Sequence, residues 1–207
     1  AKEAMKLSEE KPSALYPEFD FFVSLLDSDN QILLWTAIRI IGNLSAVDGK
    51  QHIDKLIPRL IKFLNTGKMI TAANTIQALT VIAQNRPEYR DKILKAILKV
   101  ERYTYDTFEC RNVAIGHVLK SLVLFKFEIK NKKTIVDFIQ RQTQNPRPAT
   151  RKKAEALLKA LSGKREKWIS GDGKMKAHIA KCGYRCDLCS AFKPVLTDAD
   201  KKDISRA

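Results

Sequence analysis

The sequence predicts an all-α protein, and three observations carry that prediction. Through residues 14–162, apolar residues recur with a period of about 3.6 residues, which places them on one face of a helix. Turn-forming pairs, among them Asp48-Gly49 and Asn145-Pro146, separate the periodic segments. No run of alternating β-branched residues, the usual signal of a strand, occurs in this region.

The pattern predicts helical segments at residues 31–47, 53–64, 69–84, 89–100, 110–124, 133–142 and 149–161. In each segment the apolar residues lie three or four positions apart, so that they form one stripe and the polar residues form the opposite one. The stripes of the first four segments contain, in order, Ile38 and Ile41, Ile57 and Leu60, Ile76 and Leu79, and Ile93 and Ile97. The last three segments continue the pattern.

The predicted helices come in pairs, and the pairs repeat. Small residues in the second helix of each pair fall at Ala37, Ala73, Ala114 and Ala154, at spacings of 36, 41 and 40 residues. Residues 33–44 and 149–161 resemble second helices of HEAT repeats, whose period is about 40–47 residues. The resemblance implies an α-solenoid of about four HEAT-like helix pairs in residues 14–163, after an N-terminal extension of residues 1–13. An irregular all-helical bundle is the alternative.

Stacked second helices of a solenoid line a surface that usually binds a partner. We therefore expect a non-catalytic binding scaffold, with another protein as its partner. The candidate partner-binding residues are polar side chains on the predicted second helices, namely Arg39, Asn43, Asn74, Asn112 and Lys120. The alternative is that these side chains form an ordinary solvated face.

Positive charge is concentrated in one part of the chain. The net charge is +15, and residues 120–181 alone hold 17 Lys/Arg against 5 Asp/Glu. Localised positive charge attracts polyanions, and a helix N-terminus adds to that attraction. The candidate polyanion-binding residues are Lys132, Lys133, Arg147, Arg151, Lys152 and Lys153. Nucleic-acid binding is therefore the alternative function, and a solvated lysine-rich surface is the alternative without a ligand.

HEAT-like repeats also occur in bacterial DNA glycosylases that recognise alkylated bases. That family reads DNA with a basic face and needs an aspartate beside aromatic residues. Here Tyr103-Thr104-Tyr105-Asp106 is the local match, although Asp106 lies in a turn just before Phe108-Glu109 and resembles a helix cap. Glycosylase-like chemistry is therefore a variant of the nucleic-acid hypothesis.

The C-terminal segment carries a metal-binding motif. Cys182, Cys186 and Cys189 form a C-x3-C-x2-C cluster, and thiolates at this spacing can close around one metal ion. A structural zinc site takes four ligands, and His178, one helical turn before Cys182, is the candidate for the fourth. A cysteine beyond Ala207 or a residue of a partner chain is the alternative fourth ligand.

Residues 182–192 (CGYRCDLCSAF) resemble the opening of a small prokaryotic cysteine-rich family of unknown function. The resemblance implies a zinc-binding segment in residues 175–207, truncated at its end and joined to the repeats by a linker of residues 164–174. An iron–sulfur cluster is the alternative cofactor. Radical S-adenosylmethionine enzymes share the spacing, but they carry it in a barrel of strands and helices, which this sequence does not predict.

Several functional classes lack support in the sequence. No stretch approaches about 18 uninterrupted apolar residues, so we expect no membrane span, and the first residues show no secretory core. A phosphate-binding Gly-rich loop, an H-E-x-x-H motif and a G-x-S-x-G motif are all absent. The cysteine pattern does not suggest a disulfide framework, which favours a reducing compartment. The sequence therefore predicts a cytoplasmic protein without enzymatic activity.

Overall fold

The computed structural model describes residues 1–129 and 132–162, and in these residues all regular structure is helical, without a strand. This confirms the predicted all-α class. The α-helices are α1 (Lys2–Glu10), α2 (Pro12–Leu15), α3 (Phe19–Ser24), α4 (Gln31–Leu44), α5 (His52–Lys62), α6 (Met69–Asn85), α7 (Arg90–Leu98), α8 (Phe108–Val123), α9 (Lys126–Ile129), α10 (Lys133–Gln142) and α11 (Pro148–Ser162). Short 3-10 turns extend several of them, namely η1 (Tyr16–Glu18), η2 (Leu25–Asp27), η3 (Phe63–Asn65), η4 (Pro87–Tyr89) and η5 (Lys99–Arg102).

Ala1–Ser162 form one compact unit. Residues 1–13, which we expected to be an extension, contribute α1 and part of α2 to this unit, and both helices pack against α4. Among the described helices, none has both the length and the apolar character that crossing a bilayer requires.

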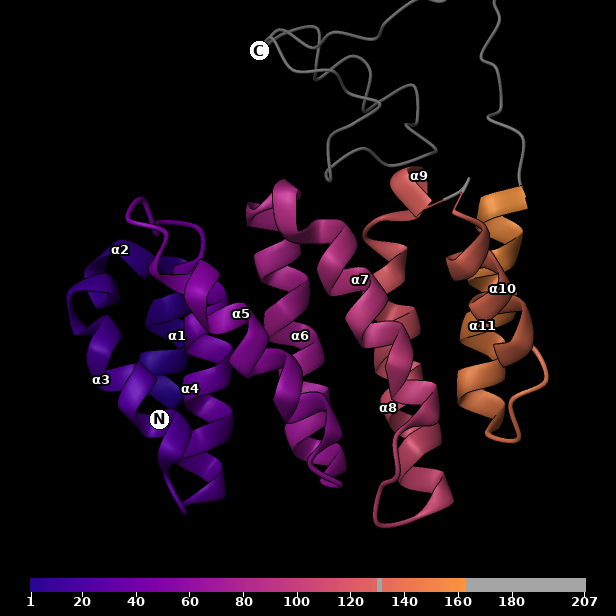
Figure 1. Cartoon of the computed structure of the whole chain (residues 1–207), viewed down its shortest axis with the longest axis horizontal. Helices are drawn as coiled ribbons and strands as arrows, with labels where there is room; N and C mark the ends of the chain where they lie inside the picture. Colours follow the sequence, from indigo (N-terminus) through magenta and orange to yellow (C-terminus); the bar gives the residue numbers. More distant parts are fainter. Residues whose placement is uncertain (130–131, 163–207) are drawn as a thin grey trace, which may run out of the picture. The chain divides into compact units, whose positions relative to one another are not determined.

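Within this unit the long helices α4, α6, α8 and α11 stand side by side in chain order (Figure 1). Each of them packs against the next, and α5, α7 and α10 pack against α6, α8 and α11 respectively. Thus the helices predicted as second members of successive pairs are direct neighbours.

Hydrogen bonds donated by side chains join these neighbouring helices. The Trp35 indole on α4 donates to Thr71 Oγ1 on α6 at 2.9 Å. The Thr80 hydroxyl on α6 donates to Ser121 Oγ on α8 at 2.7 Å. At the last junction the Thr150 hydroxyl on α11 donates to the carbonyl oxygen of Asn112 on α8 at 2.9 Å. Because these polar groups are largely buried, each bond also removes a desolvation cost.

Small residues set how closely the helices approach. A Cβ atom added at Gly42 on α4 would lie 2.7 Å from the Ala78 Cα on α6, so only glycine fits there without a shift of the backbone. The glycine of α8, Gly116, lies against Thr150 of α11, where an added Cβ would be 3.0 Å from the hydroxyl oxygen. The helix spacing therefore depends on residues that carry almost no side chain.

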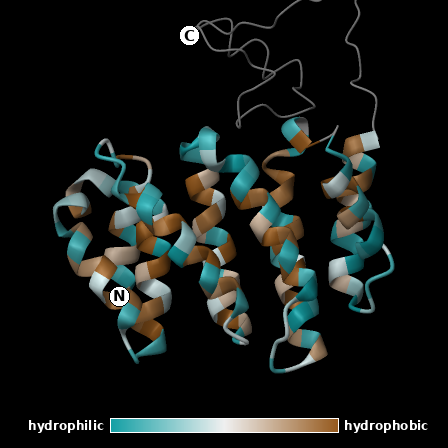
Figure 2. Ribbon diagram, in the orientation of Figure 1, coloured by the Kyte–Doolittle hydropathy of each residue, from teal (hydrophilic) through white to brown (hydrophobic). Residues whose placement is uncertain are grey.

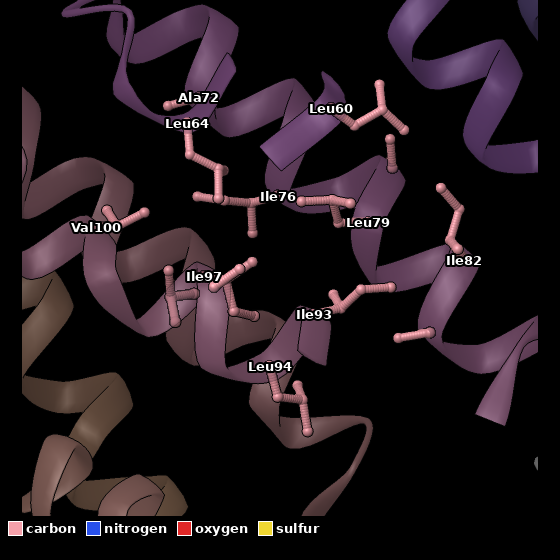
Figure 3. Close-up of a cluster of buried hydrophobic side chains, with 14 of the residues drawn as sticks. Leu60, Leu64, Ala72, Ile76, Leu79, Ile82, Ile93, Leu94, Ile97 and Val100 are labelled. Atoms are coloured by element: carbon pink, nitrogen blue, oxygen red, sulfur yellow. The ribbon is translucent and has the colours of Figure 1, made fainter. Parts of the chain in front are cut away.

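One continuous hydrophobic core runs between the helices. Figure 3 shows its central part, where side chains of α5, η3, α6, α7 and η5 meet: Leu60, Leu64, Ala72, Ile76, Leu79, Ile82, Ile93, Leu94, Ile97 and Val100. Apolar and polar residues alternate along each of the long helices (Figure 2), as expected for helices that bury one face.

Two of the long helices begin at side-chain caps. The Asn30 Oδ1 accepts hydrogen bonds from the backbone N–H groups of Ile32 and Leu33, at 3.0 and 3.3 Å, and so starts α4. The Thr107 Oγ1 accepts from the Cys110 N–H at 3.1 Å and starts α8. These caps fix the positions of the first side chains of both helices. Several of these side chains are exposed and apolar.

Candidate binding surface

Helix α1 lies on one face of α4 and shows how this face can hold a helix. The Arg39 guanidinium on α4 donates to Glu9 Oε1 on α1 at 3.3 Å. One turn further on, the Asn43 amide donates to the buried Ser8 hydroxyl at 2.9 Å. Ala4 and Met5 of α1 pack against the hydrophobic core. Two of the predicted partner-binding residues, Arg39 and Asn43, are therefore occupied by the chain itself.

The same face continues on α6 with half-exposed residues at helical spacing, Asn74, Gln77 and Val81. The Asn74 amide donates to the Ile70 carbonyl oxygen one turn earlier, at 2.9 Å. Helix α6 contains no charged residue over Met69–Asn85. This part of the surface is therefore polar but neutral.

On α8 the face changes from neutral to basic. Val113 and His117 are half-exposed and Lys120 is exposed, again at helical spacing. Lys153 of α11 lies beside them, because its Nζ donates to the Gly116 carbonyl oxygen at 3.4 Å. Burial, followed by the positive charges of Lys153 and Lys120, lowers the pKa of His117 below its ordinary value. The imidazole is therefore neutral at pH 7.

An apolar groove of about 260 Å³ shows that α4, α6 and α8 present one common face. Its walls come from all three helices and from the residues just before α6 and α8, namely Gln31, Trp35, Lys68, Met69, Ile70, Asp106 and Cys110. Trp35 lies one turn before Arg39, and Ile70 and Cys110 lie two turns before Gln77 and His117. We call the half-exposed and exposed residues of α4, α6 and α8 on this side, together with Lys153, the shared face.

Exposed apolar side chains occur at the starts of the three helices, and one of them, Ile70, lines this groove. Ile32 at the start of α4 is 62% exposed, Ile70 at the start of α6 is 45% exposed, and Phe108 at the start of α8 is 70% exposed. The Arg111 guanidinium lies over the Phe108 ring, 4.0 Å from its centroid. An exposed large apolar side chain at the start of each of three neighbouring helices marks this end of the helices as a candidate for contact with another molecule.

Asn112, a predicted partner-binding residue, lies in the interior. Its Oδ1 accepts a hydrogen bond from the Asn145 amide at 3.2 Å, and the residue is 5% exposed. Asn145 also donates to Gln142 Oε1 at 2.9 Å. Asn112 thus positions the loop before α11, and the shared face does not include it.

The predicted polyanion-binding residues are spread over three places. Lys132 pairs with Asp91 and Lys133 pairs with Asp137, where they help to line a cavity of about 250 Å³ between α7 and α10. Arg147 pairs with Glu109, and the Arg151 guanidinium donates to the Asn145 carbonyl oxygen at 3.4 Å. Lys152 is exposed on α11, and Lys153 reaches across to α8. The structure does not bring these six residues into a single patch.

The residues compared with a glycosylase site are placed as follows. Asp106 is exposed and pairs with Lys68 at 3.3 Å. Tyr105 is buried, and its hydroxyl donates to the Leu64 carbonyl oxygen at 2.7 Å. This environment raises the Tyr105 pKa, mainly through burial. The Tyr105 ring is thus part of the core rather than a free stacking surface.

The proposed metal ligands Cys182, Cys186, Cys189 and His178 lie outside the described residues, as do the linker at 164–174 and the segment 175–207. Within the described part of the chain, no group of three or more His, Cys, Asp or Glu side chains is arranged to hold a metal ion.

Comparison with known proteins gives no assignment. No protein-family model matches the sequence, and no curated protein matches it either. The candidate surface therefore rests on its own geometry.

Two parts of the surface were missed by sequence reasoning. The first is the docking of α1 on α4, for which the sequence offers only the short amphipathic pattern of Lys2–Glu10. The second is the set of exposed apolar side chains at the starts of α4, α6 and α8, namely Ile32, Ile70 and Phe108, which we call the apolar rim. Each of these side chains follows the N-cap residue of its helix by one or two positions: Ile32 follows Asn30, Ile70 follows Lys68, and Phe108 follows Thr107. That recurring position is the signal that would have revealed the rim.

Proposed function

We propose that residues 14–162 are a HEAT-like α-solenoid that serves as a non-catalytic scaffold, and that the shared face receives another protein. The single observation that carries the proposal is an apolar groove lined by three helices, each of which starts with an exposed large apolar side chain, Ile32, Ile70 or Phe108. An apolar groove with an exposed apolar side chain in its wall is typical of protein-binding sites, because burial of apolar groups drives association.

The order of the packing supports the solenoid part of the proposal. Each long helix bonds to its neighbour through residues that lie 36, 41 or 38 positions apart in sequence. Contacts that join each repeat only to the next are the defining property of repeat proteins.

Site-specific photo-crosslinking in the native host tests the scaffold function. A photoreactive phenylalanine analogue replaces Phe108 on the rim in one variant and Phe21 on α3 in the matched control. Both side chains are aromatic and more than half exposed, at 70% and 56%. We expect a discrete crosslinked protein from position 108 and none from position 21. Equal labelling at both positions, or no adduct at 108, contradicts the proposal.

We also propose a zinc site formed by Cys182, Cys186, Cys189 and His178. The proposal is supported by the thiolate spacing, and a bound ion would order a segment too short to fold alone. A reducing cytoplasm, which keeps the thiols free, is part of this proposal. Elemental analysis of the purified chain distinguishes zinc from iron, and the visible absorption of an iron–sulfur cluster provides a second readout.

Nucleic-acid binding is the second candidate function, and one observation favours it. Lys120, Lys152 and Lys159 form no ion pair with any residue in the described part of the chain. A salt titration of duplex DNA binding tests this function, because phosphate contacts make affinity fall steeply with salt. Absence of binding at low salt excludes it.

A further inference from the structure

We propose that the part of the shared face on α6, α8 and α11 binds a short amphipathic helix of a partner protein, with acidic side chains directed at Lys120 and Lys153. This inference rests on the proposed scaffold function and specifies the kind of partner.

The docking of α1 on α4 provides the precedent within the same fold. Helix α1 places apolar residues against the core while Glu9 meets Arg39 and Ser8 meets Asn43. The surface of a long helix in this protein can thus hold a second helix by apolar contact and one acid–base pair. The contact between α1 and α4 fills only the first part of the shared face.

Helix α8 also presents a cation beyond the groove. His117 and Lys120 lie about two and three turns after the groove residue Cys110, whereas Arg39 and Asn43 lie about one and two turns after the groove residue Trp35. On α4 the cation is satisfied by Glu9 of α1. On α8 the cation Lys120 is exposed and has no acidic partner among the described residues.

Charge complementarity defines the occupant. The acidic residues of α8 and α11 are Glu109, which pairs with Arg147, and Glu155, which is exposed on α11. Helix α6 adds no charge of either sign. A segment that lies across this region therefore meets a neutral polar strip on α6 and a positive one at Lys120 and Lys153. A helix with one neutral or apolar face and one acidic face matches both strips.

A nucleic acid fits this surface less well than such a helix does. Duplex DNA carries one charge per about 1.7 Å, and binding it takes cations spread along the contact. From Ile70 to Val81, α6 spans about 16 Å without a cation. Ile70, which lines the groove and is 45% exposed, would also lie against phosphates, where it gains nothing from burial.

Fluorescence anisotropy with the full chain tests the proposal. The probe is a labelled helical peptide of about 14 residues with leucines three and four positions apart and glutamates at the other positions, and its control has every glutamate replaced by lysine. We expect the acidic peptide to bind and the basic peptide not to bind. Lys120→Glu should weaken the acidic peptide at least about tenfold, and Ile70→Asp should do the same. Lys55→Glu, which changes a lysine that is also exposed but lies on α5, should have no effect.

Three results overturn the proposal. The first is equal binding of the two peptides, and the second is binding of the acidic peptide that Lys120→Glu does not weaken. The third is that a 20-base-pair DNA binds in a way that depends on Lys120 while the acidic peptide does not bind. The last result would favour the nucleic-acid function. A specific crosslink at position 108 combined with failure of the acidic peptide leaves the scaffold function in place and removes only this inference.

Discussion

The Tyr16 hydroxyl donates a hydrogen bond to the buried carboxylate of Asp48, 32 residues further along the chain. The same carboxylate accepts from the backbone N–H groups of His52 and Ile53, at 3.1 and 2.9 Å, and thereby caps the start of α5. The Arg86 guanidinium at the end of α6 reaches it at 3.4 Å. One side chain thus ties η1, α5 and α6 together at the first junction of the helix stack.

Replacement of Asp48 by alanine should destabilise the fold strongly. The change removes the α5 cap, which contributes about 0.5–2 kcal/mol, and leaves the Tyr16 hydroxyl unpaired, which costs about 1–3 kcal/mol. The Arg86 guanidinium keeps its contact with Asp54 at 3.7 Å and its bond to the main-chain carbonyl of residue 48. Urea unfolding followed by circular dichroism measures it. Asp29→Ala, at an exposed site, is the control. A loss below about 1 kcal/mol, or an equal loss in both variants, would show that Asp48 does not join these elements.

The Asp48 contacts also make the free energy of unfolding depend on pH. Burial alone would raise the Asp48 pKa, but the hydrogen bonds from Tyr16, Ile53 and His52 and the charge of Arg86 outweigh it and hold the pKa below the ordinary value. Because the folded pKa is the lower one, the stabilisation is present above the unfolded pKa of about 3.9 and is lost as pH falls through the folded value.

Unfolding free energies of the wild type and of Asp48→Asn at pH 6, 4 and 3 test this prediction. The difference between the two proteins should be largest at pH 6 and should shrink below pH 4. A difference that stays constant across this range is the contrary result.

Glycine at position 42 should be essential to the contact between α4 and α6. Alanine normally favours a helix over glycine by about 0.5–1 kcal/mol, but here its Cβ would lie 2.7 Å from the Ala78 Cα. The backbones must then separate, and overpacking costs about 1–3 kcal/mol. Thermal unfolding of Gly42→Ala should show a lower midpoint than the wild type. Gly49→Ala, where nothing lies within 4 Å of the added atom, should be nearly neutral. An unchanged or higher midpoint for Gly42→Ala would contradict the close approach.

Removal of the Cys186 thiol should release metal without disturbing the helices. If zinc is held by the C-terminal cysteines, Cys186→Ser takes away one of its thiolate ligands. The zinc content should fall to background, while the far-ultraviolet helical signal and the unfolding midpoint of the helical unit stay at wild-type values. Loss of metal and helix together would mean that the two parts do not fold separately.

Much of the fold could be predicted because helical periodicity is a local signal. The segment predicted at 133–142 is the helix Lys133–Gln142, and the segment predicted at 31–47 begins at the same residue as Gln31–Leu44. The helix Gln31–Leu44 ends earlier than the predicted segment, because Ser45 and the residues after it turn back toward α5.

The surface was harder to predict, because periodicity marks a polar stripe but does not say what covers it. Asn112 lies on the polar side of α8 by sequence, yet α11 and the loop before it bury this residue. Arg39 and Asn43 are covered by α1, which is distant in sequence. Lys153, expected to face a polyanion at a helix start, instead reaches the Gly116 carbonyl oxygen, because Gly116 has no side chain to keep it away.

Hydrogen–deuterium exchange of the full chain, free and bound to the protein captured by crosslinking at position 108, tests the central claim most directly. The account predicts that protection on binding is concentrated in Met69–Asn85 and Phe108–Val123, the two helices of the shared face that α1 does not cover, while α5, α7 and α10 exchange as before. Protection confined to α5, α7 and α10, with α6 and α8 unchanged, would contradict it.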